Sequence, residues 1–279
     1  MSLQSYYINL ESAKVRSQSL EKNYQEQVTS SWPLHRINAT NTQDIEALGV
    51  SGNLTLTEKA CFFSHVKALE ESLSNHDHAF ILEDDAHFGV YSNHAIEQAI
   101  RSLEDQPWDI LYADLGLTNP ANMVEFFMLR KELFAQGNRA WKLLKLENIA
   151  FVGATAYIVN RNSKKKLHQF LKSQASLNIP FDLVLRNLVW SKNLLAFMIF
   201  PFATTLSALA DSSQIQIQQT EVIELVWNAF RRLVWLEADD LGSPKNPNLQ
   251  ELIKLVGDSR SSAIGDLLTL SLANKFGTK

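Results

Sequence analysis

Apolar and polar positions along the chain follow two different periods in turn as far as about residue 215. Short apolar runs between turn residues are typical of buried strands, whereas apolar residues spaced three or four apart indicate amphipathic helices. We therefore expect strands at 5–10, 34–40, 78–82, 108–115, 150–159 and 194–202. We expect helices at 12–28, 55–73, roughly 93–105, 163–173 and 179–190.

Strands and helices that alternate in this way predict an α/β fold with a mainly parallel sheet. The run HAFIL at 78–82 is apolar without alternation, as expected of a strand that is covered on both faces. The helix at 55–73 has a clear beginning, because Thr55 and Glu58 have the spacing of a capping box.

One segment between these elements is less regular. Residues 116–141 carry turn signals at each end and a possible helix between them, which would be either a lid or a packed surface excursion.

The character of the chain changes after about residue 215. Helical patterns follow at 222–238, 248–257 and 261–276, with a turn-rich break after the first of them. We therefore predict an α/β domain at 1–215 and a helical C-terminal extension at 216–279.

The composition is that of an ordinary globular protein, with 46% hydrophobic and 20% charged residues in 279. A net charge of −4 argues against a nucleic-acid partner, which requires a basic surface.

The longest apolar stretch, 193–210, is broken by Pro201 and is too short for a membrane span of about 20 apolar residues. The single cysteine, Cys61, fits a reducing compartment, and the beginning of the chain lacks the pattern of a secretory signal. We expect a cytoplasmic protein.

Three consecutive acids, Glu83, Asp84 and Asp85, directly follow the strand at 78–82. Ligands of parallel α/β sheets bind beyond the carboxyl ends of the strands. Because side chains alternate along an extended chain, Glu83 and Asp85 should share one side, with Asp84 on the other. Their mutual repulsion calls for a cation, and carboxylate oxygens suit Mg²⁺ or Mn²⁺. The pattern predicts metal-assisted handling of a diphosphate; the alternative is a solvated acidic turn that caps the next helix.

Several segments, taken in order, resemble glycosyltransferase family 25, which includes lipooligosaccharide-biosynthesis β-galactosyltransferases and collagen galactosyltransferases. These segments are YYINLESAKVR, LTLTEKACFFSHVKALE, FILEDDAHF, WDILYADLG, ATAYIVNRNSKKKL and IPFDLVL. The resemblance covers about residues 6–215 and does not include the helical end of the chain.

This resemblance implies a GT-A-type domain, a UDP-sugar donor, usually UDP-galactose, a divalent metal ion, and inversion at the anomeric carbon. By position in the family's acidic motif, Asp85 would be the metal ligand with Glu83 in support. Asp84 would contact the ribose or support the site. The motif reads Glu-Asp-Asp instead of Asp-x-Asp, which leaves the ligand set open. The segment 40–54 is hard to align with the family, and we expect it to form a loop near the donor.

The resemblance also implies roles for polar residues near the first two strands. Asn9 ends the first strand, where a GT-A domain holds its nucleotide, and Asn38 and Thr40 end the second, where they would line the uracil pocket. Arg16 would contact the diphosphate or the base, or it is a surface charge of its helix.

Further candidates lie on the later helices and strands. Ser64 and His65 would contact phosphate or sugar, although His65 is equally consistent with a half-buried histidine bonded to backbone. An inverting transfer requires one general base. Asp182, which follows a proline at a helix start, is our first candidate, and its alternative role is to cap that helix. Asp114 is a rival.

We therefore expect an enzyme that transfers a hexose, galactose first, from a UDP-sugar to a glycan acceptor such as bacterial lipooligosaccharide. The alternatives are a nucleotide-sugar-binding protein without turnover and a metal-dependent phosphohydrolase. The segment WNAFRRLVW at 227–235 predicts a core-packing or dimer helix. Its alternative is an interfacial helix that would give peripheral contact with the inner membrane.

Overall fold

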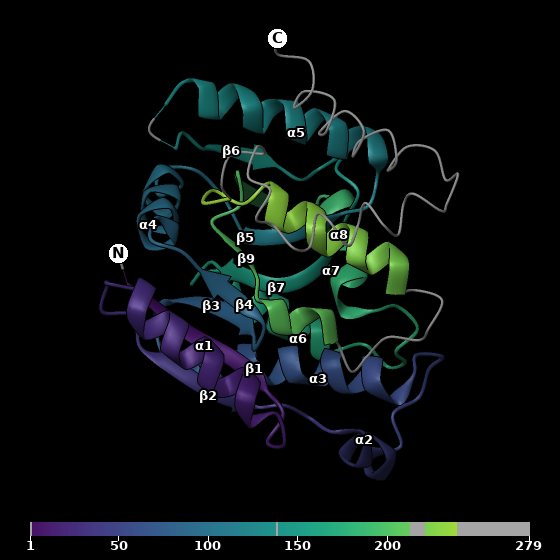
Figure 1. The fold of residues 1–279 in the computed structure, drawn as a ribbon. Coiled ribbons are helices and arrows are strands. Elements are labelled where there is room, and N and C mark those ends of the chain that lie inside the picture. The colour runs from purple at the N-terminus through teal and green to yellow at the C-terminus, as the bar shows by residue number, and fades with distance from the viewer. Residues whose placement is uncertain (1, 138, 213–220, 239–279) are drawn as a thin grey trace.

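A seven-stranded sheet with strand order β2-β1-β3-β7-β5-β8-β6 forms the centre of the molecule (Figure 1). The computed structural model describes residues 2–137, 139–212 and 221–238. The strands of this sheet are β1 (Leu3–Asn9), β2 (Leu34–Asn38), β3 (His78–Glu83), β5 (Ile110–Leu117), β6 (Lys142–Lys145), β7 (Phe151–Val159) and β8 (Ala196–Phe200). A second, two-stranded sheet pairs β4 (Ala86–Phe88) with β9 (Thr204–Leu206) in antiparallel fashion.

The central sheet is mainly parallel, as its sequence predicts. Strand β1 runs parallel to both β2 and β3, and β5 runs parallel to β8. Strand β7 lies antiparallel between β3 and β5, and β6 is antiparallel to β8. Strands β2, β1, β3, β5 and β8 therefore point in one direction, so their carboxyl ends lie at the same edge of the sheet.

Helices cover both faces of this sheet (Figure 1). They are α1 (Lys14–Gln27), α2 (Thr42–Leu48), α3 (Leu56–Glu71), α4 (Ser92–Ser102), α5 (Pro120–Ala135), α6 (Lys164–Lys172), α7 (Phe181–Trp190) and α8 (Glu221–Leu233). Side chains alternate along β1, so Tyr6 joins a core with residues of α3, α6 and α7, while Tyr7 joins a second core with residues of α1 and α4. The fold is thus a three-layer α/β arrangement.

The predicted beginning of the helix at 55–73 is confirmed. The Thr55 side chain accepts the Glu58 backbone N–H, and the Glu58 carboxylate accepts the Thr55 N–H. The expected loop at 40–54 is wrong in part, because it contains α2. Asn41 and Asp44 form a second capping box there, and the helix ends at Gly49 with a φ of 60°.

Three short strands were not predicted from the sequence. Strands β4, β6 and β9 have three or four residues each, which is too few to show a period of two. The uncertain segment 116–141 contains α5, whose Met123, Phe126 and Leu133 are buried. Since α5 packs into the core, this segment is a packed excursion.

Helix α8 begins one residue before the helical pattern predicted at 222–238 and covers most of it, beyond the predicted domain boundary at 215. Its Phe230 is buried in the same core as α3 and α7, so the helix packs directly on the α/β domain. The predicted helices at 248–257 and 261–276 lie outside the described residues. In the part of the chain that the structure describes, no helix is both long and apolar enough to cross a lipid bilayer.

Candidate functional site

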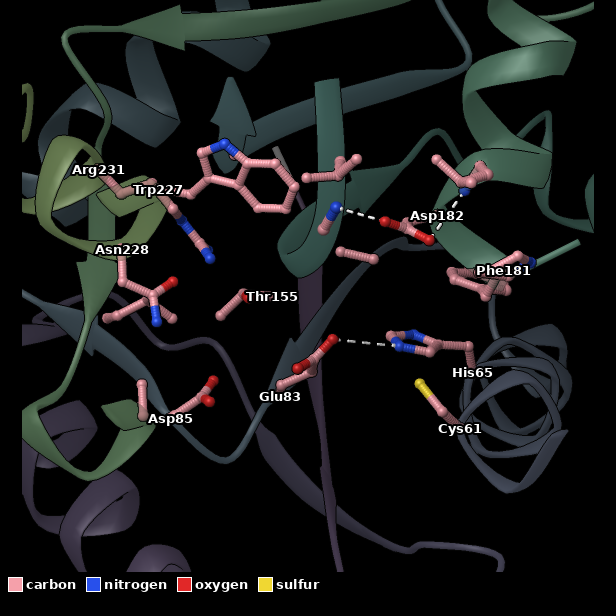
Figure 2. A pocket seen from close by; sticks show the side chains of 18 of the residues that line it. Cys61, His65, Glu83, Asp85, Thr155, Phe181, Asp182, Trp227, Asn228 and Arg231 are labelled. Carbon is pink, nitrogen blue, oxygen red and sulfur yellow. Dashed lines mark hydrogen bonds and ion pairs between the residues drawn. The ribbon is translucent and has the colours of Figure 1, made fainter. Parts of the chain in front are cut away.

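A pocket of about 510 Å³ opens at the carboxyl end of β3. Its floor carries Glu83 and Asp85, one wall comes from α3 and α7, and the facing wall comes from α8 (Figure 2). This position, beyond the carboxyl ends of mainly parallel strands, is where α/β sheets bind ligands.

The three acids diverge as their alternation predicts. Glu83 and Asp85 line the pocket, whereas Asp84 points away from it toward β1 and α1. Asp84 and Asp85 form the turn between β3 and β4, so both follow immediately on the buried strand. The sequence interpretation of these side chains is therefore confirmed in its geometry.

Arg16 connects two of the acids. Its Nε donates to Asp84 Oδ1 at 2.6 Å, and its Nη2 donates to Asp85 Oδ2 at 2.8 Å. Asn9, which is buried, donates from Nδ2 to the other Asp84 oxygen at 2.7 Å. Asp84 is thus held from both sides, and Arg16 is a partner of the acidic turn and not a free surface charge.

Asp85 keeps one carboxylate oxygen without a protein partner. Its Oδ1 is buried and makes no hydrogen bond within the described part of the chain. Burial, followed by the negative charge of Glu83, raises the pKa of Asp85 to about 7, although Arg16 acts in the opposite direction. A cation at this oxygen would favour the ionised carboxylate and offset the repulsion between Asp85 and Glu83.

His65 holds Glu83 from the α3 side. Its Nε2 lies 3.4 Å from Glu83 Oε1, its Nδ1 lies 3.2 Å from the Tyr157 hydroxyl, and its ring stacks on Phe181 at 4.2 Å. Burial would raise the pKa of Glu83, but the His65 hydrogen bond and nearby positive charges outweigh burial and lower that pKa. His65 is only 1% exposed and bonds to side chains, which corrects the alternative of a half-buried histidine bonded to backbone.

Asp182 faces this group from the beginning of α7. Its Oδ2 accepts the Gly153 N–H at 2.7 Å and its Oδ1 accepts the Leu183 N–H at 2.9 Å. Gly153 has a φ of 83°, a conformation that favours glycine, and this turns its N–H toward Asp182. Asp182 is not the N-cap residue of α7, but it accepts an N–H of the first turn and also lines the pocket. Its role as a general base stays a prediction.

Asp114, the rival candidate, is fully buried next to the pocket. Both of its oxygens accept from Arg231, whose Nε and Nη2 each lie 2.7 Å away. The strand pairing of β5 with β7 shifts on either side of Asp114, and such irregularities redirect side chains. With both oxygens engaged by a guanidinium, Asp114 is the weaker candidate for a base.

We expect Arg231→Met to destabilise the folded chain strongly. Removing one partner of a buried ion pair leaves an uncompensated charge and costs about 3–5 kcal/mol. Thermal unfolding should show a decrease in Tm of roughly 10 °C, given about 2–4 °C per kcal/mol for chains of this size. Arg101→Met is the matched control, because Arg101 pairs with Glu97 on an exposed surface and should lose less than about 1 kcal/mol. Equal losses in the two variants would contradict the structural role of the Arg231–Asp114 pair.

Other predicted nucleotide contacts lie outside the pocket lining. Asn38 pairs with Asn9 in the register of β1 and β2, at the edge of the sheet where the pocket opens. Thr40 donates its N–H to Ser64 Oγ at 2.9 Å, and Ser64 is itself buried. Their roles in binding a nucleotide stay predictions.

The α8 wall was not predicted from the sequence as part of a site. Trp227, Asn228 and Arg231 all line the pocket. The sequence segment WNAFRRLVW signalled a packed helix, and the buried contacts of Phe230 and Arg231 confirm packing on protein. An arginine on the apolar side of such a helix was the one signal that could have indicated a buried acidic partner.

Two carboxylates on the pocket floor are the candidate donors for a divalent cation. Within the described ranges, no group of three His, Cys, Asp or Glu side chains could hold a metal ion. The buried, unpartnered Asp85 Oδ1 and the nearby Glu83 carboxylate nevertheless offer hard oxygen donors on the floor of the pocket. Mg²⁺ sites commonly use one or two carboxylates and complete their coordination with water and substrate phosphates.

Cys61 lines the same pocket, but its chemistry is unfavourable. Burial, followed by the charges of Glu83 and Asp182, raises the pKa of its thiol. The thiolate is the reactive form, so Cys61 is a poor candidate for a nucleophile.

Comparison with known proteins identifies the family. A search of curated proteins gives no match. Residues 2–185, which include β1, the acidic turn and Asp182, match glycosyltransferase family 25, described as LPS biosynthesis proteins. The match covers well over half of the 279 residues. The chain therefore belongs to glycosyltransferase family 25.

Proposed function

We propose that this glycosyltransferase moves a hexose, galactose first, from a UDP-sugar to a glycan acceptor of bacterial lipooligosaccharide, with inversion at the anomeric carbon and with Mn²⁺ or Mg²⁺. The observation that carries this proposal is the pocket itself. A buried carboxylate, Asp85, lies on its floor with one oxygen that has no partner among the described residues, and a second carboxylate, Asp182, lies on a separate wall. A GT-A type of domain is part of the proposal, supported by the mainly parallel sheet with helices on both faces.

The donor would lie over the acidic turn. Asp85 and Glu83 would hold the metal ion, which supplies positive charge to the diphosphate leaving group when bound. Arg16 keeps Asp84 and Asp85 in place, and Asn9 fixes Asp84 at the end of β1, next to the expected nucleotide position. His65 orients the Glu83 carboxylate toward the pocket.

The acceptor hydroxyl would lie on the side of Asp182. In an inverting transfer, this hydroxyl attacks the anomeric carbon from the face opposite the leaving diphosphate and gives up its proton to a base. Asp182 belongs to a different wall from Glu83 and Asp85, as that geometry requires (Figure 2). The two backbone N–H groups that it accepts fix the orientation of the carboxylate.

A donor panel tests the proposal directly. We expect UDP-galactose with Mn²⁺ to stabilise the protein in a thermal-shift assay, by about 2.7 kcal/mol at a concentration one hundred times its Kd. The panel includes UDP-glucose, UDP-N-acetylglucosamine and a CMP-sugar, each with and without Mn²⁺. A CMP-sugar that stabilises the protein more than any UDP-sugar, or stabilisation that is independent of the metal, would contradict the proposal. Metal-dependent release of phosphate from the donor would instead indicate a phosphohydrolase.

A further inference from the structure

We propose that α8 forms the acceptor subsite, with the Trp227 indole as the platform on which a pyranose ring of the acceptor glycan stacks. This inference rests on the proposed function, because it assigns one substrate to one wall of the same pocket. It also goes beyond the family match, which ends at residue 185, before α8 begins.

The position of Trp227 separates it from the donor chemistry. The acids lie on the floor of the pocket, whereas the Trp227 indole projects from the α8 wall toward the side where Asp182 lies (Figure 2). A ring packed on this indole would present its hydroxyl groups to the space between the floor and Asp182. That is where an acceptor hydroxyl must be for Asp182 to take its proton.

The chemistry of this wall suits a sugar better than a phosphate. Trp227 is only partly buried, packs against the core and also lines the pocket. The π face of an aromatic ring is negative and attracts the weakly positive C–H groups of a sugar ring. Asn228, beside it, has an amide that both donates and accepts hydrogen bonds, as sugar hydroxyls require.

Neither polar group of this pair is engaged elsewhere within the described ranges. The structure gives no hydrogen bond from the Trp227 indole N–H or the Asn228 amide to a residue it describes. The positive charge on the same wall, by contrast, is already paired, since Arg231 binds Asp114 through two hydrogen bonds. The two described side chains of α8 that line the pocket without an ion-pair partner, Trp227 and Asn228, are therefore neutral, and they favour a neutral sugar over a second phosphate.

The wall is rigid enough to define such a subsite. The Arg231–Asp114 pair fixes α8 to β5, and Phe230 is buried on the same turn of the helix. Arg232 donates to the backbone oxygens of Leu206 and Ser207, next to the acidic turn, at 3.2 and 2.8 Å. Trp227 is therefore held one helical turn before three fixed positions, and little side-chain freedom would be lost when a sugar binds.

The test measures sugar binding and donor binding separately. Ligand-observed NMR would titrate the methyl glycosides of galactose, glucose, N-acetylglucosamine and heptose into the protein in the presence of UDP and Mn²⁺. For the glycoside that binds most tightly, we expect Trp227→Ala to raise the Kd by about five- to tenfold. Trp227→Phe should keep most of the affinity, and both variants should bind UDP-galactose as the wild type does.

Trp190→Ala is the matched control. Trp190 is 43% exposed, stacks on Arg186 and lies outside the pocket lining, so its loss should leave glycoside affinity unchanged. The inference is overturned if no glycoside binds the wild type, if Trp227→Ala binds the glycoside normally, or if it weakens UDP-galactose by the same factor. Failure of the proposed function looks different: the wild type would then bind no UDP-sugar in the donor panel, while Trp227-dependent glycoside binding could still be measured.

Discussion

Asp85→Asn should remove metal-dependent donor binding and sugar transfer while the protein stays folded. Asp85 carries the buried carboxylate oxygen that has no partner in the described residues, and it lies on the pocket floor. Changes to residues that merely support a metal ligand cost about 10–100-fold in affinity or activity. Loss of a direct ligand should therefore lower Mn²⁺ affinity and transfer by more than about 100-fold. Isothermal titration with Mn²⁺ and UDP, and a transfer assay, measure the two effects.

The stability of this variant can be predicted from the pKa of Asp85. Its folded pKa of about 7 lies above the ordinary value of 3.8, so the folded state binds this proton more tightly than the unfolded state. Folding stability from this group therefore falls as pH rises from 3.8 to about 7. A neutral Asn removes that penalty, although it also weakens the contact with Arg16. We expect the Tm at pH 8 to stay close to that of the wild type.

Asp84→Asn is the control for the metal assignment. Both Asp84 oxygens are held by Asn9 and Arg16, and the side chain points away from the pocket. This variant should weaken UDP-sugar binding more than it changes the dependence on Mn²⁺. If Asp84→Asn loses UDP-sugar binding and Mn²⁺ dependence to the same extent, the separate roles assigned to Asp84 and Asp85 are wrong. Near-normal transfer by Asp85→Asn would show that the metal assignment itself is wrong.

Local patterns predicted those parts of the site that depend on neighbours in sequence. Glu83 and Asp85 line the pocket together and Asp84 does not, as expected from alternation. The extended chain ends at Glu83, so the turn at Asp84 and Asp85 also contributes to this arrangement. The capping box at Thr55 fixed the beginning of α3, and with it the position of His65. These features depend on backbone geometry over a few residues, which the sequence encodes directly.

The contacts that complete the pocket come from residues far apart in sequence, and no local period encodes them. Arg231 and Asp114 are 117 residues apart, and Asn9 and Asp84 are 75 residues apart. The segment around Arg231 has the pattern of an ordinary amphipathic helix. This pattern predicts that one face of the helix is buried, but it does not indicate which element that face packs against. Topology explains why Asn9 and the acids meet, since β1 and β3 are parallel neighbours. It does not indicate which helix closes the opposite wall.

Asp182→Asn should reduce turnover by about 10²–10⁴ while the affinity for the UDP-sugar remains nearly unchanged. Asp182 lies at the beginning of α7 and lines the pocket on a wall separate from the acidic floor. The Gly153 and Leu183 N–H groups hold its carboxylate in place, so the substitution changes the proton acceptor without moving the donor site. Single-turnover transfer assays, together with titration of the donor, separate the chemical step from binding.

The same substitution should also cost some stability, and this must be measured separately. An amide keeps one oxygen for the Gly153 or Leu183 N–H, but its NH₂ group would face the other donor. An unsatisfied pairing of this kind costs about 1–3 kcal/mol. Asp44→Asn is a matched control, because Asp44 accepts the Asn41 N–H at the beginning of α2 and lies outside the pocket lining. Asp44→Asn should lose stability with normal turnover, whereas Asp182→Asn should lose turnover even well below its Tm. If the two variants behave alike, Asp182 only caps its helix, and the base must be sought elsewhere, with Asp114 the next residue to test.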